Sequence, residues 1–385
     1  MKPIIIIGSG LAGYGVAREL RKLDKLMPLL IVTRDHGDAY YKPALSAALS
    51  QDKSPEDLIT ANVNKAAQDF NATILYQTTV RNIDTALKLV VTDKGSFEYQ
   101  SLVLALGAEV IRLKLEGDGA DDVISVNDLW DYKRFREALL GAERIAILGS
   151  GLIGCEFASD LIGKGFKADV IGMTEQPLMP LIPAAAGEVL NKRFSEKGVS
   201  WHLERKVTSV MRSTSTSEKA LNVILDNGDV INADIVLSAV GLRARTTLAA
   251  EAGITVNRGI VVDDYLRTSA ENVYALGDCI EINGQTLPYV LPIMHASRVI
   301  AKTLAGQPTP VVFPPMPVTI KTQGYPILVL PAPMGVAGEW KLLEDDNGLK
   351  MGFVDQENKL LGFVLTEGQI TQQAAMVAQL GHSLE

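Results

Sequence analysis

The stretch PIIIIGSGLAGYGVAREL, residues 3–20, decides the fold, and ERIAILGSGLIGCEFASDL, residues 143–161, nearly repeats it. In both, a run of apolar residues leads into Gly-x-Gly-x-x-Gly, and a helix-like stretch follows. A continuous apolar run is typical of a parallel strand that is buried on both faces. Each copy therefore predicts a strand, a glycine turn and a helix, and the first helix is expected over residues 11–23. Two copies indicate two dinucleotide sites.

The three glycines of each motif have separate physical roles in a dinucleotide site. Gly8 permits the tight turn, Gly10 lets the backbone approach a pyrophosphate, and Gly13 lets the helix pack closely on the strand. The free N–H groups at the start of the helix then face the phosphates. An isolated motif can also simply close a strand onto a helix, but here both copies stand between an apolar strand and a helix. The expected contacts are Gly8, Ser9, Gly10, Leu11, Ala12 and Gly13 in the first copy, and Gly149, Gly151 and Gly154 in the second.

The acidic residue that commonly binds the adenosine ribose is expected about 20 positions after such a motif. After the first motif the strand PLLIVT ends at Thr33 and Arg34, where we expect the ribose contacts. After the second, Gly172 stands where the acid would end the strand, and Glu175 follows three residues later. Glu175 could reach a ribose or could be a solvated loop acid. Residues 170–191 contain no Arg or Lys to hold a 2′-phosphate, which favours NADH over NADPH.

Composition limits the classes of protein that fit. A length of 385 residues allows two or three domains, and 47% hydrophobic with 21% charged residues is typical of a globular protein. No apolar run is long enough to span a membrane, and a strand motif within three residues of Met1 leaves no room for a signal peptide. A net charge of −8 without a basic block argues against nucleic acid. The oligomeric state is not predicted.

The two cysteines, Cys155 and Cys279, are far apart in the sequence and form no C-x-x-C motif. They indicate neither a dithiol centre nor a metal site, and their apolar neighbours predict buried, inert thiols. We therefore expect a cytoplasmic protein. The four histidines are scattered, and His295 is expected to be a packing or surface residue rather than a proton donor.

The remainder of the chain shows further strands and a distinct C-terminal part. Apolar strands are expected within residues 99–113 and 233–246, and a third ends at Gly277 and Asp278. The Pro-rich residues 307–317 are expected to form a linker. The other expected elements are a helix over residues 288–306, antiparallel strands in VTIKT, PILVLPAP, EWKLLE, LKMGFV and KLLGFVLT, and a last helix over residues 369–380.

This ordered set of motifs resembles the FAD-dependent pyridine-nucleotide reductases with two dinucleotide-binding domains, over essentially the whole chain. Within that family, YYKPALS and LIGCEFASDL are most similar to rubredoxin reductases, which serve alkane hydroxylation in bacteria. The resemblance implies an α/β fold with two Rossmann-like domains, in which an inserted NAD-binding domain splits the FAD-binding domain, plus a C-terminal α+β interface domain. The implied ranges are 1–108 and 236–311 for FAD, 109–235 for NAD, and 312–385 for the interface domain.

The resemblance also implies roles for individual residues. Lys42 matches a basic residue beside the isoalloxazine, and Glu156 matches its acidic partner across the nicotinamide pocket; two surface charges are the alternative. Asp278 matches the aspartate that binds the flavin ribityl chain, next to Gly277, although a plain turn would also explain these two residues. The helix that begins near Val290 would point its N-terminus at the flavin pyrimidine.

Two further residues, Val80 and Lys321, match positions that contact adenine and flavin, and a purely structural role is equally plausible for both. The implied reaction is hydride transfer from NADH to FAD, followed by transfer of single electrons to rubredoxin. Residues 35–50 contain no cysteine, so a thiol cannot carry the electrons. A ferredoxin reductase, an NADH oxidase and a low-turnover regulatory flavin- or NAD-binding protein remain alternatives. Arg298 and Lys302 are weak candidates for docking an acidic partner.

Overall fold

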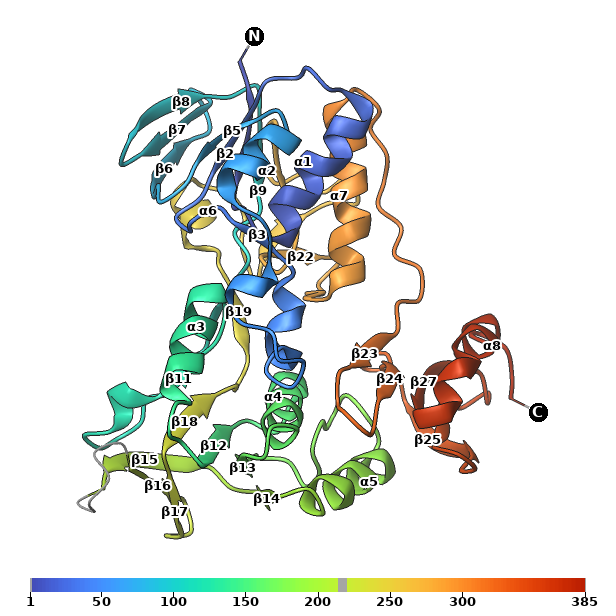
Figure 1. Cartoon of the computed structure of the whole chain (residues 1–385). Coiled ribbons are helices and arrows are strands. Elements are labelled where there is room, and N and C mark those ends of the chain that lie inside the picture. The colour runs from blue at the N-terminus through green and yellow to red at the C-terminus, as the bar shows by residue number, and fades with distance from the viewer. Residues whose placement is uncertain (1, 214–219, 385) are drawn as a thin grey trace. The chain divides into compact units, whose positions relative to one another are not determined.

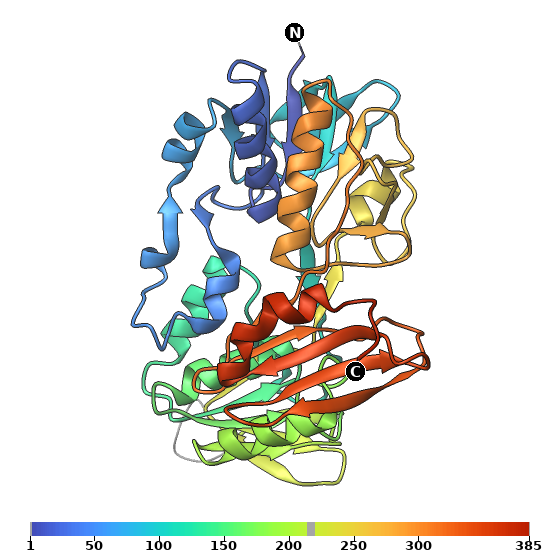
Figure 2. The same ribbon diagram turned by 90° about the vertical axis from the view of Figure 1, so that its right-hand side faces the viewer.

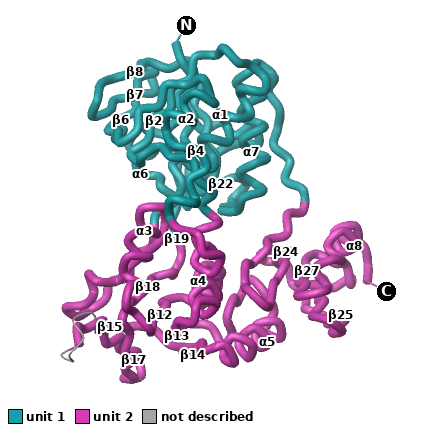
Figure 3. The backbone as a smooth tube through the Cα atoms, in the orientation of Figure 1, with its two compact units in different colours: residues 1–42, 55–109, 242–314 teal, residues 43–54, 110–241, 315–385 magenta. Residues whose placement is uncertain are grey.

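The computed structural model describes residues 2–213 and 220–384. The chain forms two compact units, each assembled from segments that are distant in the sequence (Figure 3). The predicted domain boundaries stay a prediction, and residues 214–219 of the predicted NAD-binding range lie outside the described residues. Unit 1 comprises residues 1–42, 55–109 and 242–314, and unit 2 comprises residues 43–54, 110–241 and 315–385.

Unit 1 is built on a parallel sheet of five strands, whose central strand is the apolar run of the first glycine motif. All four isoleucines of that strand are buried, as expected for a strand covered on both faces. The strand order reverses direction between β1 and β9, and ligands of such sheets bind outside the carboxyl ends of the strands at this switch point. In spatial order the strands are β21 (Val273–Ala275), β9 (Ser101–Leu104), β1 (Ile4–Ile7), β2 (Leu29–Val32) and β5 (Thr73–Leu75).

Two long helices of unit 1 lie side by side, as both ribbon views show (Figures 1 and 2). Helix α1 (Leu11–Leu23) has the predicted bounds, and α7 (Val290–Leu304) fills most of the range predicted for the later helix. A β-carbon on Gly15 of α1 would lie 2.6 Å from Ser297 Oγ of α7, so the small glycine lets the two helices approach closely here. The remaining elements of unit 1 are β3 (Ala39–Tyr40), η2 (Glu56–Leu58), β4 (Ile59–Ala61), α2 (Val63–Asp69), the antiparallel sheet β6 (Val80–Asp84), β7 (Leu89–Thr92) and β8 (Gly95–Glu98), α6 (Thr247–Glu251), β20 (Ile260–Val262) and β22 (Ile280–Ile282).

Unit 2 repeats the same parallel design around the second glycine motif. Strand β12 is central, α4 (Leu152–Ile162) follows it directly, and the order again reverses between β12 and its neighbour β18. In spatial order the strands are β11 (Ile124–Ser125), β18 (Ile235–Ser238), β12 (Arg144–Leu148), β13 (Lys167–Ile171) and β14 (Val199–His202). Around them lie η3 (Ala120–Asp122), α3 (Leu129–Ala138), α5 (Ala184–Ser195) and the antiparallel strands β15 (Val207–Arg212), β16 (Leu221–Leu225) and β17 (Val230–Ala233). The chain crosses between the units through β10 (Ala108–Val110), β19 (Leu242–Ala244) and η1 (Lys42–Ala47).

The C-terminal part of unit 2 is the predicted antiparallel sheet, drawn in red tones in Figure 2. The helix predicted over residues 369–380 is wrong in its bounds, because the structure has a 3₁₀-helix, η4 (Glu367–Gln372), followed by the short α8 (Gln373–Ala378). The side-chain amide of Gln369 donates to Asp346 O at 2.7 Å and so ties the first turn to the sheet. In spatial order the strands are β23 (Val318–Ile320), β24 (Ile327–Leu330), β27 (Leu360–Thr366), β26 (Lys350–Asp355) and β25 (Gly338–Glu344).

Two features are absent from the described part of the chain. No helix within residues 2–213 and 220–384 is long and apolar enough to cross a membrane. Over the same residues, no group of three or more His, Cys, Asp or Glu side chains could hold a metal ion.

Candidate dinucleotide sites

The first glycine loop connects β1 to α1 in unit 1 and leaves no room for side chains at two of its glycines. Gly8 has a φ of +115°, and a β-carbon there would lie 2.2 Å from Ala105 O. A β-carbon on Gly13 would lie 1.9 Å from Gly8 O. Both contacts are with backbone, which cannot swing aside as a flexible side chain could. The loop therefore requires glycine at both positions, in agreement with the roles expected for a tight turn and for close helix packing.

Gly10, in the middle of this loop, faces open space. No atom lies within 4 Å of the place that a β-carbon on Gly10 would take. Packing within the chain therefore does not require glycine at this position. A glycine is expected there if a phosphate approaches the loop backbone directly. Beside it, the buried Ser9 hydroxyl donates to Thr33 Oγ1 at 3.0 Å, which joins the loop to the end of β2. Two predicted contact residues thus lie together at the carboxyl edge of the sheet.

The second glycine loop, in unit 2, has the same construction. Gly149 has a φ of +116°, and its β-carbon would lie 2.5 Å from Ala239 O. A β-carbon on Gly154 would lie 1.9 Å from Gly149 O, whereas Gly151 faces open space. Each unit therefore carries one cradle that a dinucleotide pyrophosphate fits.

The missing acid after the second motif has a steric explanation. A β-carbon on Gly172 would lie 2.0 Å from Ser150 Oγ, so this position holds no side chain at all. Glu175 is exposed in the loop that follows, and its ribose contact stays a prediction. The backbone N–H of Arg205 donates to Gly172 O at 2.9 Å. The backbone of Arg205, three residues beyond the end of β14, therefore lies at this edge, which the sequence did not reveal because it depends on strand pairing.

Asp278 lies in unit 1, directly after Gly277 at the end of β21. Gly277 has a φ of +86°, and its β-carbon would lie 3.0 Å from the β-carbon of Ala12 at the start of α1. Burial raises the pKa of Asp278, and the positive charges of Lys42 and Arg245 partly offset that rise. Asp278 thus follows a residue that packs on the start of α1, and its predicted contact with the flavin ribityl chain stays a prediction. Arg245 was not predicted to belong to this site.

Glu156 is fully buried in α4, with 1% of its surface exposed, so it is not a surface charge. Its carboxylate accepts hydrogen bonds from Ser46 Oγ at 2.5 Å, from Lys321 Nζ at 2.8 Å and from the Lys321 backbone N–H at 2.9 Å. Lys321 Nζ also donates to Pro43 O at 2.6 Å. Two predicted site residues therefore form one ion pair, although their pairing with each other was not predicted. The predicted pairing of Glu156 with Lys42 stays a prediction.

The other predicted residues take their places at the ends of regular elements. Val80 begins β6 and Val290 begins α7, and both are half-buried, while Arg34 is exposed after β2. Their contacts with a cofactor stay predictions. Cys155 and Cys279 are buried free thiols, and burial raises the pKa of Cys279 to about 11. A thiol with so high a pKa is protonated at neutral pH and is a poor nucleophile, as expected.

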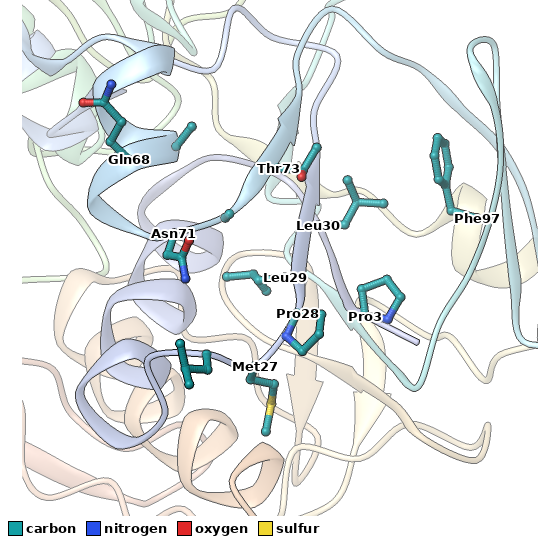
Figure 4. Close-up of a pocket in the computed structure, with 12 residues that line it drawn as sticks. Pro3, Met27, Pro28, Leu29, Leu30, Gln68, Asn71, Thr73 and Phe97 are labelled. Carbon is teal, nitrogen blue, oxygen red and sulfur yellow. The ribbon is translucent and has the colours of Figure 1, made fainter. Parts of the chain in front are cut away.

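A hollow of about 770 Å³ lies at the other end of the unit 1 sheet (Figure 4). Its lining includes Pro3, Pro28 and Thr73, at the amino ends of β1, β2 and β5. The glycine loop lies at the carboxyl ends of the same strands, so this hollow is no part of the dinucleotide site.

The parallel sheet of unit 2 contains one buried charge network that we expect to matter for stability. Asp169 is 1% exposed and accepts two hydrogen bonds from Arg144, at 2.5 and 2.8 Å, and His202 Nε2 lies 3.0 Å from its carboxylate. Burial alone would raise the pKa of Asp169, but Arg144 and then His202 outweigh it, so the pKa lies below the usual value. The network joins β12, β13 and β14.

Asp169→Asn is expected to lower the free energy of unfolding at pH 7 by about 1–3 kcal/mol, because a charged hydrogen-bond partner is lost. A lowered pKa stabilises the fold above the unfolded-state pKa of about 3.9, and this stabilisation is lost as pH falls through the folded-state pKa. The difference from the wild type should therefore shrink below about pH 4. Urea denaturation at several pH values measures it. Asp122→Asn, which breaks an exposed pair with Arg212, is the control and should have little effect. A difference that does not depend on pH would contradict the role of the charge.

Comparison with known proteins assigns the chain to a family. Residues 2–301 match the family described as pyridine nucleotide-disulphide oxidoreductase. The chain belongs to this oxidoreductase family. Residues 310–380 match the rubredoxin binding C-terminal domain. The membership confirms the predicted resemblance, the fold class, the cofactors FAD and NADH, and rubredoxin as partner.

Individual relatives can be aligned with nearly the whole length of this oxidoreductase. It is 42% identical over 380 residues to a rubredoxin-NAD(+) reductase of Alcanivorax borkumensis, with 99% of both chains covered. It is 34% identical over 378 residues to a nitric oxide reductase FlRd-NAD(+) reductase of Aliivibrio fischeri, with 98% of both covered. The crystal structure of an NADH:rubredoxin oxidoreductase from Clostridium acetobutylicum has the same fold, with a TM-score of 0.82 at 21% identity, covering 100% of this chain and 96% of the other.

Proposed function

We propose that this oxidoreductase transfers electrons from NADH through FAD to rubredoxin, and that in the cell it serves alkane hydroxylation. One NADH would reduce two rubredoxins by one electron each and release one proton. The match of residues 310–380 to a rubredoxin-binding domain, on a chain with two dinucleotide cradles, carries the proposal. The buried, protonated thiols agree with the predicted location in the reducing cytoplasm.

The residues of the two cradles fit two bound dinucleotides. The open faces of Gly10 and Gly151 leave room for a pyrophosphate, and the N-termini of α1 and α4 point N–H groups at that space. FAD, when bound, supplies the conversion between a two-electron donor and one-electron acceptors. We assign it to unit 1, where Asp278 can accept a hydrogen bond from a ribityl hydroxyl, and NADH to unit 2.

The chain's own groups would position the reactants rather than form covalent bonds to them. The buried Glu156 pairs with the half-buried Lys321, and together they join the second turn of α4 to residues 43–46. We propose that this pair, with Lys42, orients the nicotinamide for transfer, a step that depends on placement and needs no nucleophile. No cysteine stands in residues 35–50, so electrons would leave directly from the cofactor.

The second candidate acceptor is FlRd, the nitric oxide reductase that appears in the name of the Aliivibrio fischeri relative. The 34% identity of this chain to the Aliivibrio fischeri reductase favours this second candidate. The identity to the rubredoxin-NAD(+) reductase of Alcanivorax borkumensis is higher, at 42%. The two candidates differ in the protein that accepts the electrons. A ferredoxin reductase and an NADH oxidase are further outcomes of the test below.

The test is cytochrome c reduction by NADH and the purified protein, with rubredoxin, with a ferredoxin, or with neither. We expect a yellow protein with non-covalent FAD and a rate that rises with rubredoxin concentration. The rate should change with salt if charged side chains steer the encounter. A rate that is indifferent to rubredoxin would contradict the proposal. NADH consumption with oxygen alone at the same rate would instead indicate an oxidase.

A further inference from the structure

Arg245 lies at the switch point of the unit 1 sheet, where its ligand is expected. The turn at residues 105–107 leaves the carboxyl end of β9, and Ala105 O is the atom against which Gly8 packs. Arg245 Nη1 donates to Leu106 O at 3.1 Å, and its backbone N–H donates to Gly107 O at 3.1 Å. The guanidinium is therefore fixed against one wall of the crevice between β1 and β9.

The same turn is held from its other side by the residue that follows Asp278. The Cys279 thiol donates to Leu276 O at 3.2 Å and to Leu104 O, at the end of β9, at 3.6 Å. The turn at residues 105–107 thus lies between Arg245 on one side and the segment that carries Asp278 on the other. One short piece of backbone fixes the position of both side chains.

We propose that Arg245 is a positioning residue of the FAD site, which braces the turn after β9 and holds Asp278 as the carboxylate that accepts a ribityl hydrogen bond. The charged groups that act on Asp278 within unit 1 are Lys42 and Arg245, and both favour the ionised form. Burial opposes them and raises the pKa of Asp278. Without Arg245, Asp278 would take up a proton at higher pH and would accept that bond more weakly, because a neutral carboxyl group is a poorer acceptor than a carboxylate. This inference rests on the assignment of unit 1 to FAD.

The experiment measures FAD release, not turnover. Holoprotein is diluted at pH values from 8 to 5, and free FAD is measured by its fluorescence. Arg245→Gln is expected to weaken FAD binding by about tenfold to a hundredfold, the range for a hydrogen bond to a charged group, and the loss should grow as pH falls. Arg243→Gln is the matched control, because Arg243 is exposed and pairs with Glu109 at 2.8 Å. It should behave as the wild type does.

Two further variants separate charge from bracing. Arg245→Lys keeps the charge, so its pH profile should resemble that of the wild type even if the turn is held less firmly. Asp278→Asn has no carboxylate, so adding Arg245→Gln to it should cause no further dependence on pH. Equal FAD affinity in the wild type and Arg245→Gln at every pH would overturn the proposal, as would the same pH-dependent loss in the Asp278→Asn background. A wild type that binds no FAD would instead contradict the proposed function.

Discussion

Glu156→Gln is expected to slow reduction of the bound flavin by NADH on the order of a hundredfold, while FAD stays bound. An amide in place of the carboxylate would turn an NH₂ group toward at least one donor of the buried network, from Lys321 or Ser46. The second turn of α4 and Lys321 would then shift. A misplacement of about 1 Å between reactants can cost about a hundredfold in rate.

Stopped-flow absorbance of the flavin after mixing with NADH measures this rate. Lys42→Ala should also slow the reaction if Lys42 acts on the same pocket. Asp160→Asn is the matched control, because Asp160 lies one turn further along α4, is equally buried, and holds the backbone N–H groups of Leu49 and Ser50 instead. It should lower stability with a smaller effect on the rate. Unchanged reduction in Glu156→Gln and Lys42→Ala would remove both residues from the mechanism.

Gly154→Ala and Gly151→Ala are expected to fail in different ways, although they lie three residues apart. A methyl group at residue 154 would meet Gly149 O at 1.9 Å, so the turn must distort, and overpacking of this kind costs about 1–3 kcal/mol or more. A methyl group at residue 151 meets nothing in the folded chain but enters the space that the pyrophosphate needs. Gly151→Ala should therefore keep its stability and bind NADH about tenfold more weakly, equivalent to about 1.4 kcal/mol.

Thermal unfolding and NADH titration, both with FAD bound, distinguish the two outcomes. Gly10→Ala and Gly13→Ala provide the same comparison in unit 1, with FAD retention as the measurement. If Gly151→Ala binds NADH as tightly as the wild type, the second loop is not a pyrophosphate cradle. Loss of stability in Gly151→Ala would show that other atoms of the chain occupy the space beside Gly151 in solution.

Patterns in short stretches of sequence predicted those helices, strands and turns whose structure depends on neighbouring residues in the chain. The apolar run before Gly8, the helix at residues 11–23 and the C-terminal strands follow from side-chain periodicity and from the steric needs of glycine, and these depend on near neighbours in the chain. The last helix was wrong in its bounds because Gln369, in its first turn, donates to the Glu344 side chain at the end of β25 and to the backbone oxygen of Asp346 in the loop that follows.

The candidate site was predicted residue by residue but not in its connections. The pair between Glu156 and Lys321 joins positions 165 residues apart, and no spacing rule reports such a contact. Arg245 directly follows β19, the strand with which the chain returns to unit 1 after residues 110–241 of unit 2. Its place near Asp278 therefore depends on how distant segments of unit 1 assemble. The approach of Arg205 to Gly172 likewise depends on the register of β13 and β14.

The close contact between Gly172 and Ser150 limits how the nucleotide preference of this protein could evolve or be redesigned. Any side chain at residue 172 would collide with Ser150 Oγ, 2.0 Å from the β-carbon position, before it could touch a ribose or a phosphate. A single substitution there would damage the loop without changing the choice of coenzyme. Removal of the Ser150 hydroxyl alone would not clear the space, because Ser150 Cβ lies 2.5 Å from the same position. An exchange of preference must therefore begin with loss of the whole Ser150 side chain, or bypass residue 172 through the exposed Glu175. The order of mutational steps is thus imposed by one serine side chain.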